Sequence, residues 1–278
     1  MSSIGGQALI EGVMMISDEK VAMAARKPDG RIVTKKENRH HLTVRYKKIP
    51  LVRGALALWE MLSLGMKGLM WSSEQAEEQE EKTSGIAMTL TVLFSFLVGI
   101  ALFIALPFYL AKSVTENHFL FNLIDGALRV AVFLAYLIVI SRMKDVRRLF
   151  QYHGAEHMAV HCNEHKKKLT VGNVEKFTTL HPRCGTAFLF LVLLVSILVF
   201  TLVYSSNWIA KFFLRILLIP VIAAISYEIL KFSAKHQNNL FFRSLIKPGL
   251  WFQMITTKRP DKKQIEVAIT ALKAVLRA

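Results

Sequence analysis

Four long apolar stretches limit what this chain can fold into more than any other feature of its sequence. A helix needs about 20 predominantly apolar residues to cross the hydrocarbon core of a bilayer. Hydrophobic residues make up 53% of the chain and charged residues only 20%, which is unusual for a soluble protein. We therefore expect a mainly α, polytopic membrane protein with about four transmembrane helices, over residues 86–111, 119–141, 187–205 and 209–232.

The positive charge of the chain is concentrated between and after these stretches. The formal net charge is +16; residues 142–186 hold nine Lys or Arg against four acids, and residues 233–278 hold nine against two. Because Lys and Arg accumulate in cytoplasmic loops, we expect the N-terminus, the 142–186 segment and the C-terminus in the cytoplasm. The pattern predicts a multi-pass protein of the cell (inner, cytoplasmic) membrane. Its expected partner is the lipid bilayer, and no nucleic acid is needed to explain the charge.

The N-terminal segment has the pattern of a small β-rich element. Pro28-Asp29-Gly30 is a strong turn sequence between two strand-like runs, 21–26 and 31–35, and it predicts a β-hairpin. Residues 42–46 are a candidate third strand. The opening residues 4–15 are apolar and rich in glycine, with the carboxylate of Glu11 in their midst. An acid in such surroundings requires a cation, a metal or backbone donors, unless the segment is a strand with Glu11 on its polar side.

The remaining polar segments predict cytoplasmic amphipathic helices. Residues 51–71 combine apolar positions with scattered charges and indicate a helix lying on the membrane surface, followed by an acidic linker over 74–82. Residues 247–251 read as a turn, and Asp261 is a suitable N-cap for a final helix that docks on the protein or on the membrane. The predicted segments are a β-rich element (1–48), an interfacial helix and linker (49–85), two spans (86–141), a His-rich loop or helix (142–186), two spans (187–232) and a helical tail (233–278).

Several charged side chains fall within the predicted spans. Asp125 and Arg129 stand four residues apart, as do Lys211 and Arg215. Charges inside a membrane are costly unless they face protein or water. We expect an internal ion pair with Lys211 reaching toward the interface, or a small polar pocket in the outer leaflet.

A histidine-rich stretch of the cytoplasmic segment has the strongest chemical pattern. His153, Glu156 and His157 form H-x-x-E-H, the inverted form of a zinc-hydrolase motif. Side chains four apart on a helix lie on one face, so the two histidines can bind one metal, with Glu156 as general base. His161 and His165 extend the stripe, with a drift of about 40° per step. The same stripe also suits lipid headgroups or water without any metal.

A zinc site with open coordination needs a third protein ligand, and the sequence offers three candidates. Cys184 and His181 directly precede the third apolar stretch, and Glu228 lies near the end of the fourth, at the depth expected for the His-rich helix. Arg183 is placed to stabilise negative charge that develops on a carbonyl or phosphoryl group. The expected cofactor is therefore Zn²⁺ or another divalent metal.

Four separated motifs resemble the YqhQ family of bacterial membrane proteins. They are residues 4–15, 152–157 and 183–186, together with the tail residues Pro248-Gly249-Leu250-Trp251, Gln253, Thr256-Thr257 and Pro260. The family is a domain of unknown function, described only as predicted metal-dependent, so the resemblance implies no particular activity. The resemblance implies that six residues belong to one functional unit: Glu11, His153, Glu156, His157, Arg183 and Cys184.

Two functions of different classes follow from these patterns. The first is a zinc-type hydrolase with its site at the cytoplasmic membrane interface and a lipid or peptide substrate. The second is a non-enzymatic membrane scaffold, lipid-binding regulator or small transporter, with a structural metal or none. Three protein ligands would favour the enzyme, and a closed set of four would favour a structural site.

Overall fold

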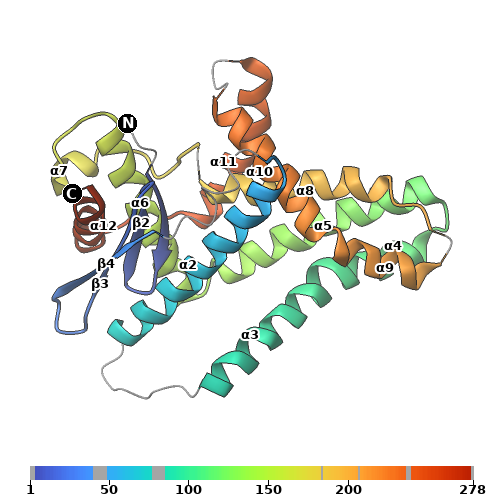
Figure 1. Cartoon of the computed structure of the whole chain (residues 1–278), viewed down its shortest axis with the longest axis horizontal. Helices are drawn as coiled ribbons and strands as arrows, with labels where there is room; N and C mark the ends of the chain where they lie inside the picture. Colours follow the sequence, from blue (N-terminus) through green and yellow to red (C-terminus); the bar gives the residue numbers. More distant parts are fainter. Residues whose placement is uncertain are drawn as a thin grey trace.

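The chain folds into a sheet-containing part and a bundle of apolar helices, which meet at the histidine-rich helix (Figure 1). The computed structural model describes residues 4–39, 49–76, 85–182, 184–205, 207–235 and 239–276. The sheet part lies at one end of the long axis, and the apolar helices extend from it toward the other end.

The N-terminal segment forms a four-stranded antiparallel sheet in the order β1-β2-β3-β4. The predicted hairpin around Pro28-Asp29-Gly30 is confirmed as β3–β4, with Gly30 at φ 86°. The opening residues form a second hairpin, β1–β2, whose turn holds Glu11 at φ 50°. The candidate strand 42–46 lies outside the described residues. The strands are β1 (Gly5–Leu9), β2 (Gly12–Ile16), β3 (Lys20–Arg26) and β4 (Ile32–Asn38).

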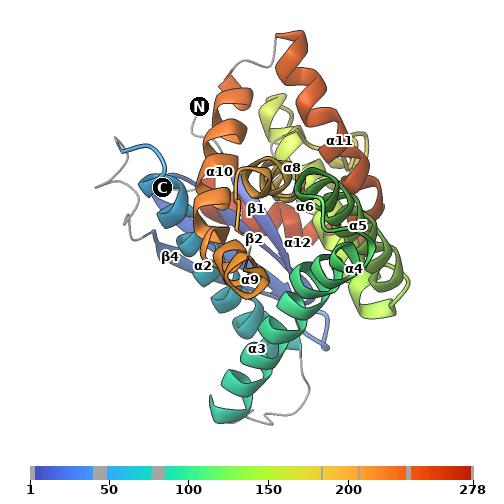
Figure 2. The same ribbon diagram turned by 90° about the vertical axis from the view of Figure 1, so that its right-hand side faces the viewer.

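The sheet is covered on both faces, which explains why β2 is apolar at almost every position rather than alternating. All five residues of β2 are buried. One face packs on α2 (Val52–Ala76) through Met14 and Met23, and the other packs on α6 (Lys144–Glu164) and α12 (Lys262–Leu276) through Val13 and Met15. Figure 2 shows the sheet between α2 on one side and α6 and α12 on the other.

The final helix docks on the protein, which was one of the two predicted alternatives; the other was docking on the membrane. Asp261 caps α12, since the main-chain N–H of Gln264 donates to its carboxylate at 2.8 Å. The buried stripe of α12 includes Ile265, Ala268 and Leu272 and joins the same core as α6 and the sheet. The N-terminal sheet, the His-rich helix, the short helix α7 (Val171–Val174) and the C-terminal helix therefore form one unit.

The predicted transmembrane helices are confirmed in part. Thr89–Val114 and His118–Ile140 are long and apolar enough to cross a bilayer. The fourth predicted span is a pair of helices bent by 45°, which makes three spans if the pair counts as one, and the third predicted span is a shorter apolar helix of 17 residues. Four spans are thus not confirmed. The helices are α3 (Gly85–Ile100), η1 (Ala101–Ala105), α4 (Leu106–Val114), α5 (His118–Ile140), α8 (Gly185–Thr201), α9 (Trp208–Leu217) and α10 (Ile219–Lys235).

Two prolines in the C-terminal half have different effects: Pro220 lies at the bend between α9 and α10, whereas Pro248 does not produce the turn predicted at residues 247–251. Pro220 lies at the start of α10, where its ring cannot continue the helical hydrogen bonds of α9. Pro248 lies inside α11 (Leu240–Thr256), so the predicted turn at 247–251 is wrong. The adjacent Gly249 brings α11 against α8; a Cβ there would lie 2.8 Å from Ala187 Cα. The helix thus continues through Pro248 where it packs closely on α8.

The charged residues of the apolar bundle form a buried ion-pair cluster, as expected. Asp125 Oδ2 accepts hydrogen bonds from Arg129 at 2.9 Å and from Arg215 at 2.7 Å. Asn122 accepts a further bond from Arg215 at 2.6 Å. Lys211 does not reach outward: it is buried, with its ammonium 3.9 Å from the centre of the Phe121 ring.

Candidate metal centre

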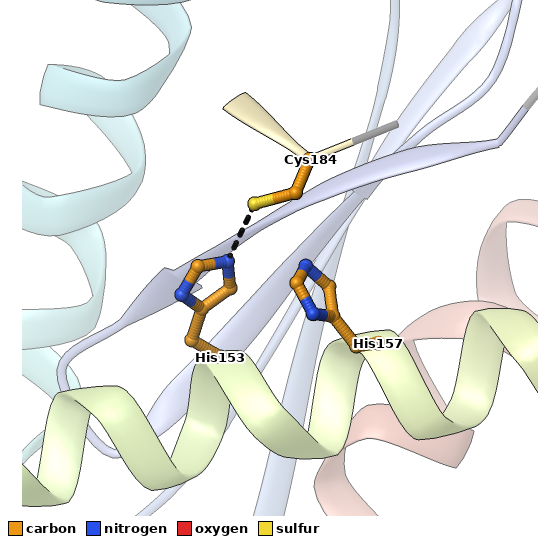
Figure 3. Close-up of side chains that lie close together, drawn as sticks. All are labelled: His153, His157 and Cys184. Carbon is orange, nitrogen blue, oxygen red and sulfur yellow. Dashed lines mark hydrogen bonds between the residues drawn. The ribbon is translucent and has the colours of Figure 1, made fainter. Parts of the chain in front are cut away.

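The two histidines of H-x-x-E-H lie side by side on α6 (Figure 3). Their ring centroids are 4.4 Å apart, which confirms the geometry expected for side chains one helical turn apart. α6 begins at Lys144, so Gly154 falls well inside the helix. His157 is buried and His153 is half-buried, so the pair is open on the His153 side.

Hydrogen bonds to the main chain fix the tautomer of both rings. His153 Nδ1 lies 2.9 Å from the carbonyl oxygen of Thr256, and His157 Nδ1 is bonded to the carbonyl oxygen of Thr179. A carbonyl oxygen only accepts hydrogen bonds, so each Nδ1 carries the proton and each Nε2 keeps a free lone pair. Metal-binding histidines typically donate their other ring N–H to such an acceptor.

Cys184 completes a set of three donor atoms. Its sulfur lies 3.2 Å from His153 Nε2, as the dashed line in Figure 3 marks. In a tetrahedral zinc site, bonds of about 2.05 Å to nitrogen and about 2.3 Å to sulfur put these two atoms about 3.5 Å apart. The donor atoms of His153, His157 and Cys184 all lie within 4.8 Å of one another. The three residues therefore offer the donor types of a zinc site, and the His153–Cys184 pair is already near the tetrahedral separation.

The start of α8 supports the cysteine. Cys184 is the N-cap of this helix, and the main-chain N–H of Thr186 donates to its sulfur at 3.3 Å. The Thr186 hydroxyl lies 3.2 Å from the same sulfur. A helix N-terminus stabilises negative charge through its dipole and its free N–H groups. This environment suits an anionic sulfur ligand.

Glu156 lies at the buried edge of the three donors. Its Oε2 is 3.4 Å from His157 Nε2, the atom that would bind the metal. Its carboxylate also packs against β1, where a Cβ on Gly6 would lie 2.5 Å from Oε1. Burial raises the pKa of Glu156 to about 7, partly offset by the nearby His153. A carboxyl group in this state exchanges a proton near neutral pH.

The end of α11 and the irregular segment after it contact α6 beside the two histidines. The main-chain N–H of Lys258 donates to the carbonyl oxygen of Phe150 at 2.9 Å. The carbonyl oxygen of Lys258 lies against Gly154, where a Cβ would approach it to 2.1 Å. Glycine at this position therefore brings the Thr256 carbonyl within reach of His153.

Two other predicted acids have different partners. Glu11 accepts hydrogen bonds from the Arg148 guanidinium and, at 3.1 Å, from the Tyr152 hydroxyl. Its partner is therefore a cation on α6, and it does not join His153, His157 and Cys184. Glu228 forms a two-pronged ion pair with Arg53 of α2. The structure therefore does not bring Glu228 to the two histidines. Arg183 lies outside the described residues.

His161 and His181 form a cluster of their own, one turn further along α6. Their ring centroids are 4.5 Å apart, and His181 Nε2 is 3.3 Å from Glu164 Oε2. The angular drift of the stripe explains the separation, because two steps rotate His161 by about 80° from His153. Burial lowers the pKa of His181 to about 4, partly offset by Glu164, so the ring is neutral at physiological pH.

Sequence reasoning missed most of the supporting groups. Gln253 holds His181 from both sides, accepting from its main-chain N–H and donating to its carbonyl oxygen, each at 2.8 Å. Thr179 and Thr256 act through carbonyl oxygens, which every residue carries, so their types gave no signal. Glu164 was detectable, since it lies three residues after His161 on the same helix face.

Comparisons with known proteins agree with the resemblance seen in the motifs. The family model described as "Protein of unknown function (DUF1385)" matches residues 49–278. The chain is 35% identical over 294 residues to "Uncharacterized protein YqhQ" of Bacillus subtilis (strain 168), covering 98% of this chain and 92% of that protein. No solved structure matches the chain. The chain therefore belongs to the YqhQ (DUF1385) family of proteins of unknown function.

Proposed function

We propose that this protein is a membrane-bound, zinc-type hydrolase whose metal is held by His153, His157 and Cys184. One observation carries the proposal: two main-chain carbonyls fix both imidazoles in the tautomer with a lone pair on Nε2, and Nε2 of His153 lies 3.2 Å from the Cys184 sulfur. Three protein donors leave a fourth tetrahedral position open, which is the pattern of catalytic rather than structural zinc.

The chain's own residues divide the chemistry among them. The ion, when bound, supplies Lewis acidity toward a carbonyl or phosphoryl oxygen. Glu156 Oε2, 3.4 Å from His157 Nε2, accepts the proton of an attacking water and returns it to the leaving group. Thr179 and Thr256 keep the two imidazoles in position, and Thr186 does the same for the cysteine sulfur.

The proposed location is the cytoplasmic face of the membrane, with both termini on that side. Three basic segments, the N-terminus, residues 142–186 and the C-terminal tail, supply the charge asymmetry, and their folded parts share one core. Cys184 immediately precedes the apolar helix α8. The proposed site of His153, His157 and Cys184 therefore lies where the sheet-containing part meets the bundle of apolar helices. A substrate reaching this position is a peptide or a lipid-linked molecule at the bilayer surface.

The test pairs metal content with turnover in purified full-length protein in detergent. His157→Ala should lose the zinc ion of this centre, whereas Glu156→Gln should keep it, because Glu156 is not among the three donors. Zinc-dependent cleavage of a 4-nitrophenyl fatty ester or of fluorescent casein should fall by about 10²-fold or more in Glu156→Gln. Equal turnover per bound zinc in Glu156→Gln and wild type would remove Glu156 as the base. Bound zinc with no zinc-dependent cleavage of either probe would support a structural metal instead.

A further inference from the structure

A second group of potential metal ligands lies beside the first, in the cluster of His161, Glu164 and His181. One donor atom from each lies within 4.8 Å of the other two. We propose that these three residues hold a second divalent transition-metal ion, separate from the His153–His157–Cys184 centre. The proposal stands on this cluster alone and does not require that the protein be a hydrolase.

The tautomer of His161 leaves a nitrogen available to a metal. His161 Nε2 lies 2.8 Å from the carbonyl oxygen of Leu180, so it must carry the proton, and the lone pair is on Nδ1. The ring of Phe177 lies parallel to the imidazole, with an interplanar angle of 5° and centroids 6.3 Å apart. The hydrogen bond to Leu180 thus orients the imidazole, with Phe177 parallel to it.

His181 is also fixed in advance. Both polar groups of its main chain are bonded to the buried Gln253 side chain, and its own side chain is only 6% exposed. Glu164, at the end of α6, is 30% exposed and therefore leaves a route for an ion from solvent. Two histidines with defined main-chain and side-chain partners and one more accessible carboxylate form a built site rather than a chance surface cluster.

The donor types separate this site chemically from the first. Two imidazoles and one carboxylate accept zinc, manganese or ferrous iron, whereas the thiolate of the first centre favours softer ions such as zinc. The two sites are neighbours, because the rings of His157 and His181 have centroids 5.6 Å apart. A competing explanation is a plain hydrogen bond between His181 and Glu164 with no metal, and the test must distinguish the two.

The experiment counts metal ions per chain in the full-length protein. Protein stripped with chelator is reloaded with Zn²⁺ or Mn²⁺ alone, dialysed, and analysed by elemental mass spectrometry. We expect two zinc ions per wild-type chain and one in Glu164→Gln or His161→Ala. The matched control is His165→Ala, which alters an exposed histidine on the same helix end and should keep two.

Cobalt reports on folding and on the first centre in the same variants. Only a site with a thiolate gives sulfur-to-cobalt charge-transfer absorption, so Co²⁺-loaded Glu164→Gln should keep this band while losing one ion. Equal zinc content in Glu164→Gln and wild type would overturn the second site, as would loss of the cobalt band together with both ions. If the first centre alone is absent, wild type and Cys184→Ser will each bind one ion, which disappears in Glu164→Gln.

Discussion

Replacing Gly154 with alanine tests how the proposed metal centre is assembled. By helix propensity alone, Gly154→Ala should stabilise α6 by about 1 kcal/mol. The structure predicts the opposite, because the new Cβ would lie 2.1 Å from the Lys258 carbonyl oxygen and 3.2 Å from the Thr179 side chain. The carbonyl belongs to the main chain, so it cannot rotate away and must retreat by about 1 Å to reach a tolerated contact.

That retreat has an energetic and a chemical consequence. Overpacking of this kind costs about 1–3 kcal/mol, and loss of the hydrogen bond from Lys258 to Phe150 adds about 1 kcal/mol. After the gain in propensity, we expect a net destabilisation of about 1–3 kcal/mol. Thr256 precedes Lys258 by two residues, so the acceptor of His153 moves as well. Loss of such a supporting contact typically weakens metal binding by about 10–100-fold.

The assay is thermal unfolding in detergent, with and without zinc, together with a zinc titration. Gly172→Ala is the matched control, because nothing lies within 4 Å of a Cβ at that helical glycine. We expect the control to keep or raise the wild-type Tm, while Gly154→Ala loses about 2–4 °C per kcal/mol. If both variants match in Tm and zinc affinity, the packing of the Lys258 segment on α6 is refuted.

Three further predictions address the rest of the molecule. Asp125→Asn should destabilise the bundle by about 3–5 kcal/mol, because it leaves two buried arginines without their shared anion. The control is Asp145→Asn, on the first turn of α6, and an equal Tm in the two variants would contradict the buried ion-pair cluster. Glu228→Gln should leave the metal content unchanged and cost about 1 kcal/mol or less, since its ion pair with Arg53 is partly exposed; loss of zinc would restore Glu228 as a ligand. Burial raises the Glu156 pKa from 4.5 to about 7, so this group contributes stability below pH 4.5 that is lost as the pH rises through 7, about 3 kcal/mol in all. Unfolding of metal-free Glu156→Gln should therefore vary less with pH than wild type over that window, and parallel curves would show that Glu156 is not buried.

The local part of the site could be predicted from sequence, because it depends on helical spacing alone. His153 and His157 are four residues apart, so any helix through them brings their rings together. Cys184 was one of three candidates for a third donor, and the structure places it, rather than Glu228, beside His153, where the start of α8 and the end of α11 meet α6. His181 lies in the separate group with His161 and Glu164. That choice depends on long-range contacts, which spacing in the sequence does not encode.

The fold was predictable where a local sequence sets the conformation, and not where the conformation depends on contacts with distant parts of the chain. Pro28-Asp29-Gly30 sets the β3–β4 turn by itself, whereas the turn at Glu11 uses a non-glycine residue at positive φ that carries no strong signal. The run Val13-Met14-Met15 is apolar because both faces of the sheet are covered, which requires α2 from one side and α12 from the far end of the chain. Residues 209–232 are predominantly apolar, so composition predicts one continuous helix, whereas the structure bends this stretch between α9 and α10.

Cobalt absorption of the purified full-length protein tests the central claim, a metal held by His153, His157 and Cys184, most directly. We predict a sulfur-to-cobalt charge-transfer band in wild type that disappears in Cys184→Ser and falls sharply in His153→Ala and His157→Ala. The band should persist in His118→Ala, whose ring is bonded to the Thr201 carbonyl at the far end of the bundle. A wild-type protein that takes up cobalt without this band, or takes up none, would contradict the account.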